Sequence, residues 1–471
     1  MTSAVVVGSG PNGLAAAVRL AQEGISVRVL EAEPSIGGGS RSSAATLPGL
    51  VHDECSAFHP MALASPFLSS LGLERHGLRW RWPEIELAHP LDGGRAALLY
   101  RDLAETASGL GAGGRAWAAT VGSTAQRFAE LVPDLLGPVL HVPRRPVAFA
   151  RFGGLAALPA SALTRHWKDE QASALFAGIA AHAFTRLDAP FSSAVGLVLG
   201  AAGHAVGWPV AEGGSQRIAD ALVARLAELG GRVETGVRVE RVEDAGPADL
   251  LLLCVAPRAA ARILAGRLPG AVARSYARYR HGPAAFKVDY AIEGDVPWAA
   301  ADVRRAGTVH LGGTFEEISR SEEQAVQGRM PANPFVLVGQ QFVADPLRSS
   351  GGLNPLWAYA HVPNGYAGDA TEAVTAQIER FAPGFRGRIR AVSARTVAQA
   401  EAHNANCVGG DVAGGANTPS QLVFRPRAAA DPYATGVPGV FLCSASTPPG
   451  GGTHGMAGFH AAERALAHLR R

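Results

Sequence analysis

Three glycines near the start of the chain, Gly8, Gly10 and Gly13, have the spacing of a phosphate-binding turn. They follow an apolar run at residues 5–7 and precede a helix that we expect over residues 14–23. Gly8 permits a tight turn, Gly10 lets the backbone approach a pyrophosphate, and Gly13 lets the helix pack closely on the strand. The N-terminus of the helix would then face the phosphates.

A second strand, expected at residues 27–30, ends at Glu31, whose carboxylate could accept hydrogen bonds from ribose hydroxyls. The glycine pattern alone is weak evidence, because residues 109–114 also fit it. That second copy follows a polar stretch rather than a strand, so we expect a loop there. The first copy has its strand, helix and acidic residue in place and predicts a dinucleotide site.

The segment at residues 31–42 distinguishes between dinucleotides. Gly37 and Gly38 would let backbone amides reach the pyrophosphate from its other side, and Arg41 could pair with a phosphate oxygen. The segment, with Ser42 after its glycines, resembles the second phosphate-contacting motif of FAD enzymes in the flavin amine oxidase and phytoene desaturase superfamily. The resemblance implies that the cofactor is FAD.

This resemblance continues along most of the chain. Residues 209–242 are similar to the middle segment of that superfamily, in which a valine backbone contacts adenine, and Val239 matches this position. Residues 286–290 and 440–446 resemble the phytoene desaturase-like branch related to pyridine nucleotide–disulfide oxidoreductase domain proteins. The resemblance does not identify a substrate.

A second glycine-rich segment, residues 450–458, precedes an alanine-rich helix near the end of the chain. The resemblance implies that Gly455 and Met456 contact the isoalloxazine, where backbone amides would stabilise the negative charge of reduced flavin. His454 could be an acid, a base, a substrate contact or an ordinary loop histidine. The complete set of predicted cofactor-binding residues is Gly8, Gly10, Pro11, Asn12, Gly13, Glu31, Ala32, Gly37, Gly38, Gly39, Arg41, Ser42, Val239, Ser444, Gly455 and Met456.

Lys287 and His454 are the predicted catalytic residues. Lys168 and Lys287 are the only lysines in the chain, and Lys287 stands where flavin amine oxidases carry a lysine that holds a water near flavin N5. An amine there could position water, relay a proton or assist flavin reoxidation. Apolar neighbours on both sides leave open whether Lys287 faces the flavin or solvent. His52, Asp53 and His59 follow the glycine loop and rank below Lys287, since Asp53 could merely satisfy turn amides.

Composition excludes several classes of protein. The 43 basic residues nearly balance 40 acidic ones, so the pI near 8.8 indicates no strong attraction to nucleic acid. The four cysteines are widely spaced, which disfavours metal binding and disulfide reductase chemistry. We expect no metal. We also expect a cytoplasmic location with peripheral membrane contact left open, because the first strand leaves no room for a signal peptide and no apolar stretch is long enough to span a bilayer.

The predicted fold is α/β, with a Rossmann-type FAD-binding domain of the GR2-like kind interleaved with an α+β substrate domain that contains a mixed sheet. Nucleotide motifs at the start, middle and end make the FAD-binding domain discontinuous. In the mixed sheet we expect strands at residues 96–100, 285–292, 308–312 and 335–342, with helices on one face, and another strand-like run at residues 78–82. The predicted FAD-binding segments are residues 1–76, 209–276 and 402–471, and the substrate-domain segments are residues 77–208 and 277–401.

The predicted substrate site is a long apolar cavity between the domains. Its walls would be the helical segment from Phe184 to Trp208 and the sheet carrying Lys287, Phe335 and Phe342, and glycines within residues 194–199 would leave space for a ligand. Such a cavity suits an isoprenoid, polyene or acyl chain.

We expect hydride transfer from a substrate carbon to flavin, with oxygen, a quinone or another protein as electron acceptor. The alternatives are a flavin amine oxidase, a redox-neutral alkene isomerase and a non-catalytic interaction protein that retains FAD. The oligomeric state stays open.

Overall fold

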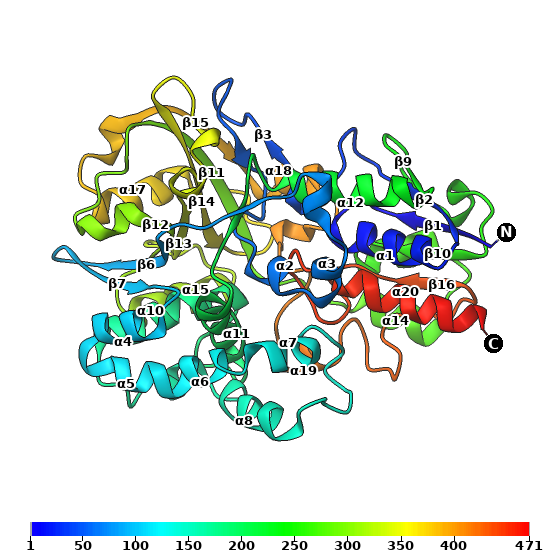
Figure 1. The fold of residues 1–471 in the computed structure, drawn as a ribbon, viewed down its shortest axis with the longest axis horizontal. Helices are drawn as coiled ribbons and strands as arrows, with labels where there is room; N and C mark the ends of the chain where they lie inside the picture. Colours follow the sequence, from blue (N-terminus) through cyan, green and yellow to red (C-terminus); the bar gives the residue numbers. More distant parts are fainter. Residues whose placement is uncertain (1, 471) are drawn as a thin grey trace.

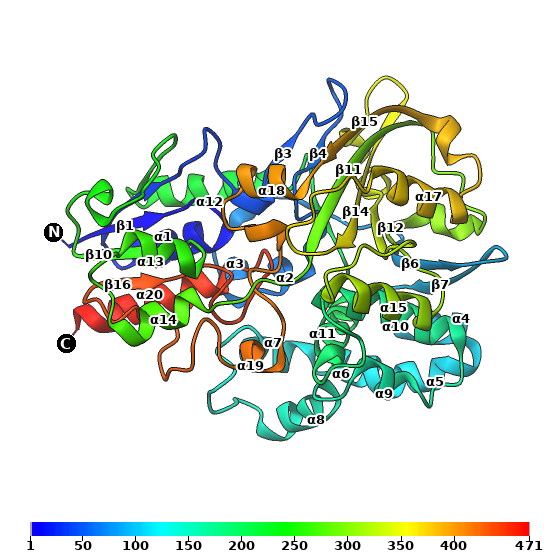
Figure 2. The ribbon, with the colours of Figure 1, turned by 180° about the vertical axis from the view of Figure 1, so that it is seen from behind.

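The structure is a computed structural model that describes residues 2–470. A parallel sheet with its helices forms one half of the molecule, and a mixed sheet with a group of helices forms the other (Figures 1 and 2). Both ends of the described chain lie in the first half, on the same side (Figure 1).

The parallel sheet has the strand order β16-β10-β1-β2-β9. Its central strand β1 is apolar and buried on both faces, as expected of a strand between two layers of helices. The strands are β1 (Ser3–Val7), β2 (Ser26–Leu30), β9 (Arg232–Glu234), β10 (Leu250–Leu253) and β16 (Val440–Leu442). Strands thus come from the start, middle and end of the chain, and the Rossmann-type fold predicted from the sequence is confirmed.

Helices cover both faces of this sheet. On one face α1 (Pro11–Gln22), α12 (Gln216–Glu228) and α20 (Met456–Leu469) share a core with it, and on the other face α13 (Pro257–Ile263) and α14 (Gly270–Ala277) do so. The first and last helices nearly touch along their backbones. A Cβ atom on Gly458 would lie 1.7 Å from the carbonyl oxygen of Asn12, so only glycine fits there.

The mixed sheet has the order β15-β11-β14-β13-β12-β6-β7, with β6 and β12 parallel and all other neighbours antiparallel. The strands are β6 (Ile85–Leu91), β7 (Arg95–Leu99), β11 (Ala284–Glu293), β12 (Ala306–Leu311), β13 (Val336–Gly339), β14 (Leu353–Val362) and β15 (Ile389–Arg395). The predicted mixed sheet is therefore confirmed.

The prediction that helices cover one face of this sheet is wrong. Phe286 and Val288 share a core with α17 (Thr371–Phe381) on one face. On the other face Leu337 and Trp357 share a core with α10 (Glu170–Ala180) and α15 (Phe315–Val326). Strand β11 is therefore buried on both faces, with Phe286, Val288 and Tyr290 on one face and Lys287 and Asp289 on the other.

Three local predictions also need correction. Residues 109–114 belong to consecutive helical turns rather than a loop. The strand expected at 335–342 ends at Gly339, and Phe342 lies on a short helix. In the run at 78–82, only Trp80 and Arg81 form a strand.

The remaining elements are short strands, which pair as β3 with β4 and β5 with β8, and connecting helices. The short strands are β3 (Ser42–Ser43), β4 (His52–Asp53), β5 (Trp80–Arg81) and β8 (Val210–Ala211). The helices are α2 (Pro60–Ala64), α3 (Pro66–Ser70), α4 (Leu103–Gly109), α5 (Gly114–Trp117), α6 (Ser123–Ala125), α7 (Phe128–Leu135), α8 (Pro146–Ala156), α9 (Ala160–Thr164), α11 (Ser192–Ala205), α16 (Gln341–Ala344), α18 (Val397–His403) and α19 (Pro419–Val423).

Candidate functional site

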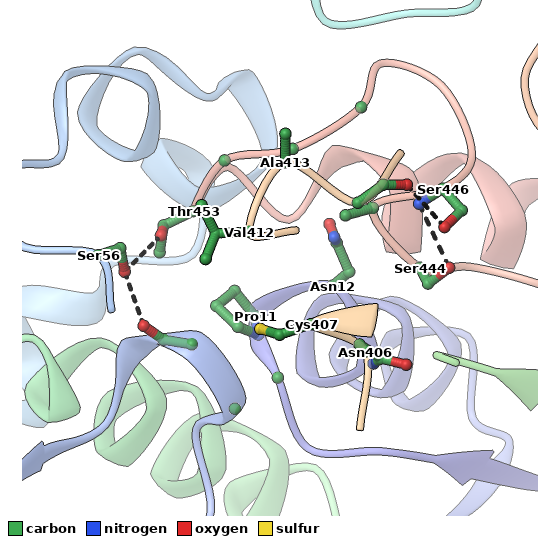
Figure 3. Close-up of a pocket in the computed structure, with 18 of the residues that line it drawn as sticks. Pro11, Asn12, Ser56, Asn406, Cys407, Val412, Ala413, Ser444, Ser446 and Thr453 are labelled. Atoms are coloured by element: carbon green, nitrogen blue, oxygen red, sulfur yellow. Dashed lines mark hydrogen bonds between the residues drawn. The ribbon is translucent and has the colours of Figure 1, made fainter. Parts of the chain in front are cut away.

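One cavity of about 1380 Å³ runs from the carboxyl edge of the parallel sheet to the mixed sheet. The N-terminus of α1 forms part of its wall, and segments from residues 406–413 and 444–453 lie across from it (Figure 3). Both halves of the fold contribute lining residues. Of the predicted cofactor-binding residues, those that line it are Gly8, Gly10, Pro11, Asn12, Glu31, Ala32, Gly38, Gly39, Arg41, Val239 and Ser444.

The glycine turn before α1 leaves an open cradle at the cavity wall. Gly8 adopts a left-handed backbone with φ of +100°, and a Cβ atom on Gly13 would lie 2.0 Å from the carbonyl oxygen of Gly8. A Cβ atom on Gly10 would meet only the Cα of Gly38, at 4.0 Å. A phosphate group therefore has space beside the N-terminus of α1, whose first backbone N–H groups are donors of the kind that bind phosphate.

Glu31 ties the loops of this wall together. Its Oε2 accepts hydrogen bonds from the backbone N–H of Ser9, at 2.9 Å, and from Ser9 Oγ, at 2.6 Å. Its Oε1 accepts one from the N–H of Glu33, at 3.0 Å. Oε2 thus has both lone pairs engaged, whereas Oε1 retains one, so Glu31, which lines the cavity, could accept one further hydrogen bond from a ribose through Oε1.

The second glycine loop touches the first. A Cβ atom on Gly38 would lie 3.1 Å from the Cα of Gly10, so the two loops meet at one edge of the cavity. Buried Arg41 donates from Nη1 to the carbonyl oxygen of His403 at 3.0 Å, and its Nη2 lies 3.6 Å from Glu31 Oε1. The Arg41 Nε has no partner among the described residues, which leaves one donor for a ligand.

Three of the predicted cofactor-binding residues stand behind this wall rather than in it. Gly13 and Gly37 support the turn and the loop, and Ser42 donates to Asp53 Oδ1 at 2.8 Å while accepting from the N–H of Gln216 at 3.1 Å. Val239, in the segment that pairs with Glu31 and Glu33, is buried in the core beside the parallel sheet and lines the cavity at this end.

Gly455 and Met456 do not line the cavity. The backbone N–H of Met456 donates to His454 Nδ1 at 3.0 Å, so this amide is already occupied. Gly455 adopts φ of +69°, and a Cβ atom there would lie 2.9 Å from Ala15 on α1. The part of the C-terminal glycine segment that reaches the cavity is the loop at residues 449–454.

His454 presents a neutral imidazole at this loop. Burial lowers its pKa to about 4, and the carbonyls of Gly451 and Gly450 offset only part of that effect. Because Nδ1 accepts from Met456, the proton resides on Nε2, which has no hydrogen-bond partner among the described residues. Thr453 beside it donates to Ser56 Oγ at 3.1 Å, which holds the loop against the glycine wall (Figure 3).

Lys287 faces the cavity from β11, and its side chain is only 8% exposed. Its ammonium forms an ion pair with Asp289, two positions along the same face of the strand. The other oxygen of Asp289 lies 3.2 Å from Nδ1 of His52, which is also buried. Burial would raise the pKa of Asp289, but Lys287 and then His52 outweigh it and hold that pKa below its usual value.

Sequence reasoning missed the charged partners around Lys287. Glu54 is ion-paired with Arg395, and although burial would raise its pKa, hydrogen bonding from Ser43, followed by the charges of Arg395 and Lys287, holds it low. Glu54, Cys55 and Arg395 all line the cavity. Glu54 and Cys55 lie in the segment after the glycine loop that the sequence had singled out, whereas Arg395 carries no local signal.

Of the three residues ranked below Lys287, only His59 lines the cavity. Burial lowers the pKa of His59 to about 4, and its Nε2 lies 2.8 Å from Ser215 Oγ. Asp53 is fully buried, accepts from Arg348 Nη1 at 2.6 Å and from the N–H of Ser215 at 2.7 Å, and has a structural role. This agrees with the alternative that Asp53 satisfies backbone amides.

The end of the cavity beyond Lys287 is an apolar chamber. One face of α11 forms part of its wall, but the glycines of α11 do not create its space: a Cβ atom on Gly196 would lie 2.9 Å from Phe176. Phe335 and Phe342 do not line the cavity, contrary to expectation, and Trp357 and Tyr359 do. The chamber residues are Leu135, Leu136, Phe149, Phe152, Ala156, His182, Phe184, Phe191, Ala194, Val195, Val198, Leu199, Trp208, Thr308, Leu337, Trp357 and Tyr359.

His182 is the one imidazole among these chamber residues and was not predicted. Its Nε2 lies 3.0 Å from Nε2 of His310, and burial lowers the pKa of His182 to about 3, so the ring is neutral. Phe184 stacks on His361 with ring centroids 3.9 Å apart. No group of three or more potential metal ligands occurs within residues 2–470, and all four cysteines are free thiols.

Comparisons with known proteins support the fold. Residues 6–66 match the model of the NAD(P)-binding Rossmann-like domain, which is about an eighth of the chain. No curated protein matches the sequence.

Solved structures match over the whole length. An oxidoreductase from Methanosarcina mazei is 15% identical with a TM-score of 0.63, covering 100% of both chains. Putrescine oxidase bound to putrescine is 19% identical with a TM-score of 0.63, covering 100% of this chain and 99% of that one. Cyclohexylamine oxidase from Brevibacterium oxydans is 17% identical with a TM-score of 0.56, covering 100% of both. At these identities the likeness establishes a shared fold.

Proposed function

We propose that this protein is an FAD-dependent oxidoreductase of the flavin amine oxidase and phytoene desaturase-like type, acting on a hydrophobic substrate. The observation that carries the proposal is the single cavity, which connects the phosphate cradle at Gly10 with the apolar chamber beyond Lys287. A cofactor lying along it would bring its far end to the chamber entrance.

FAD fits this cavity better than a nicotinamide dinucleotide. The second glycine loop and Arg41 supply a further phosphate-facing wall, and the loop at residues 449–454 closes the cavity from the opposite end of the chain. Glu31 and Val239 would hold the adenosine half, and Gly10, Asn12, Gly38 and Arg41 the pyrophosphate. Bound FAD supplies the two-electron acceptor for hydride from a substrate carbon.

The charge distribution favours an uncharged substrate carbon as the hydride donor. Lys287 is a cation at the entrance to the chamber, and Asp134, a carboxylate that lines the cavity, is engaged by His141 at 2.9 Å and by the N–H of Arg144. A protonated amine would meet the like charge of Lys287, and Glu54 is already paired with Arg395, so the amine would enter at a desolvation cost. An isoprenoid, polyene or acyl chain would instead bury its apolar surface against α11 and the mixed sheet.

Residues of the chamber would perform the remaining chemistry. The neutral imidazole of His182 could hydrogen-bond a substrate on this side, and because burial lowers its pKa to about 3 it is a weak base for any proton lost beside the hydride. The Lys287 ammonium, held in place by Asp289, would orient a water or stabilise negative charge during reoxidation. Oxygen, a quinone or a protein would take the two electrons.

The experiment begins with the purified protein, which should be yellow and release about one FAD per chain on acid precipitation. Under anaerobic conditions, apolar isoprenoid or acyl compounds should bleach the flavin absorbance. Bleaching by small amines with peroxide release would instead favour amine oxidation, and product without net reduction would favour isomerisation. A colourless protein that binds no added FAD would overturn the proposal.

A further inference from the structure

A cluster of exposed apolar side chains occupies the loop before α8 and the first turn of that helix. Leu140, Val142 and Val147 are 63%, 88% and 68% exposed, and Val139 is 45% exposed. Four of the eleven large apolar side chains that are exposed among residues 2–470 therefore lie within nine consecutive positions. Single exposed apolar residues are ordinary on protein surfaces, but a contiguous group of them marks a surface that contacts another protein or a membrane.

This cluster is surrounded by positive charge. Arg144, Arg145 and Arg151 are exposed, and none of them pairs with a carboxylate within the described part of the chain. From residue 135 to residue 168 the chain carries five arginine and lysine residues and no aspartate or glutamate. We call the exposed residues Val139, Leu140, Val142, Arg144, Arg145, Val147 and Arg151 the α8 face.

A neighbouring segment extends this surface. Leu140 and Phe424 line the same shallow groove, together with Arg427. Phe424 is itself 43% exposed. Residues 412–430 contain no acidic residue, and of their two arginines Arg427 is half-buried whereas Arg425 is buried, so this segment adds mainly the apolar side chain of Phe424 to the surface.

The loop of the α8 face has a defined shape. Asp134 accepts hydrogen bonds from His141 Nε2 at 2.9 Å and from the backbone N–H of Arg144 at 3.0 Å. The ring of His141 packs edge-on against Phe149 of α8 with centroids 5.8 Å apart. The exposed side chains are thus presented outward by an anchored loop.

Helix α8 lies between part of this face and the cavity. Phe149, Phe152 and Ala156 line the cavity, whereas Val147 and Arg151, four positions apart on another side of the helix, are exposed. A helix is about 10 Å across with its side chains, so whatever contacts Val147 and Arg151 lies about one helix diameter from the chamber, and Val139 of the preceding loop lines the cavity directly. Figures 1 and 2 place α8 at one end of the molecule, opposite β15.

We propose that the α8 face docks on the surface of a bilayer that contains anionic phospholipids. The apolar side chains would enter the headgroup region, and the unpaired arginines would bind lipid phosphates. No described helix is long and apolar enough to cross a bilayer, so the attachment is peripheral. Docking brings the chamber wall next to the phase in which apolar substrates concentrate. The inference depends on surface residues alone and is independent of the proposed oxidoreductase activity.

The test is cosedimentation of the full-length protein with vesicles of phosphatidylcholine alone or with phosphatidylglycerol added. The parent protein should bind the anionic vesicles, and less at high ionic strength. Leu140→Glu/Val142→Glu should abolish binding. Arg144→Gln/Arg145→Gln should weaken it about 25-fold, since each arginine near an anionic surface is worth about fivefold.

Matched controls carry the same chemical changes elsewhere on the surface. Val392→Glu/Leu347→Glu replaces apolar residues that are 45% and 72% exposed, and it should bind like the parent. Arg258→Gln/Arg274→Gln, which removes two exposed arginines on α13 and α14, should do the same. Thermal unfolding checks that all four variants remain folded.

Three results would overturn the proposal. One is a parent protein that binds neither kind of vesicle, and another is binding of anionic vesicles by Leu140→Glu/Val142→Glu that equals the binding by the parent. The third is a parent dimer, detected by light scattering, that this variant converts to monomer while vesicle binding is absent, which would identify the face as an interface between two copies of the chain.

Discussion

Replacing Lys287 by methionine should destabilise the protein, because Asp289 would remain buried without its cation. The two side chains are 8% and 5% exposed, so solvent screens their interaction little. Removing one partner of a buried ion pair costs about 3–5 kcal/mol. Unfolding entropy is about 2.1 cal/mol/K per residue, so for a chain of 471 residues that unfolds as one unit the loss in Tm is about 3–5 °C.

The double variant Lys287→Met/Asp289→Asn is the matched comparison. It removes both charges, leaves no buried carboxylate, and should recover most of the lost Tm. His52, which lies 3.2 Å from Asp289, would still have a polar neighbour. The two single variants and the double variant form a cycle that isolates the energy of the pair.

The pH dependence of the single variant provides a second readout. In the parent the pKa of Asp289 is held low, so its contribution to stability is present above the unfolded pKa and lost as pH falls through the folded value. In Lys287→Met the charge of Lys287 no longer opposes the effect of burial on Asp289. The pKa of Asp289 in the folded variant is therefore higher, and the variant loses stability as pH rises through that pKa. The difference in Tm between parent and variant should therefore narrow from about pH 8 to about pH 5.

Thermal unfolding monitored by flavin fluorescence at several pH values measures both effects. Anaerobic reduction and aerobic reoxidation, timed separately on the double variant, report whether Lys287 also acts on the chemistry. A Lys287→Met protein with the Tm of the parent at every pH, or a double variant no more stable than the single one, would refute the ion-pair reasoning.

Three further predictions follow from the geometry. Gly10→Val should keep its fold, since a Cβ at residue 10 would meet only the Cα of Gly38, at 4.0 Å, but it should lose FAD because the added side chain enters the phosphate cradle. The control Gly387→Val, where a Cβ would meet nothing within 4 Å, should retain FAD. Retention of FAD by Gly10→Val contradicts the placement of the cradle. Burial raises the pKa of Glu86 to about 7 and the N–H of Trp208 offsets only part of this, so its contribution to stability is lost as pH rises from the unfolded pKa through about 7; Glu86→Gln should flatten the fall in Tm between about pH 5 and 7, and an unchanged slope contradicts it. Substrate analogues should bind about fourfold more tightly for each added methylene until the chamber is filled, as titrated by flavin absorbance, and affinity that is flat with chain length contradicts an apolar substrate.

The glycine turn could be predicted from sequence because its determinants lie close together. Gly8, Gly10 and Gly13 act within one turn and the start of one helix, and their roles follow from backbone conformation and contact distance. The direction of Lys287 could not be predicted, since both faces of β11 are buried and the alternation of Lys287 with Phe286 and Val288 does not say which face meets the cavity. Asp289 is only two positions from Lys287, but its role as the partner of a buried cation follows only once the direction of the Lys287 side chain is known.

Long-range partners have no local signal at all. Glu54 and Arg395 are ion-paired across 341 positions, and nothing near either residue predicts the other. The glycines of α11 show a related limit. The sequence cannot distinguish a glycine that leaves an empty space from one against which a neighbouring side chain packs, and Phe176 packs against Gly196. At Met456 the local amide was predicted to face a ligand, but the adjacent His454 ring occupies it.

The close packing of α1 against α20 has a consequence for biosynthesis. Helix α1 leaves the ribosome long before its glycine-sized partner, Gly458, has been made. Strand β16, at the edge of the parallel sheet, is equally late, and β10 is also made long after β1 and β2. During synthesis the apolar strands β1 and β2 would therefore stand exposed for many seconds, at rates of about 5–20 residues per second. In a cell depleted of chaperones that hold nascent chains, this protein should aggregate as it is made.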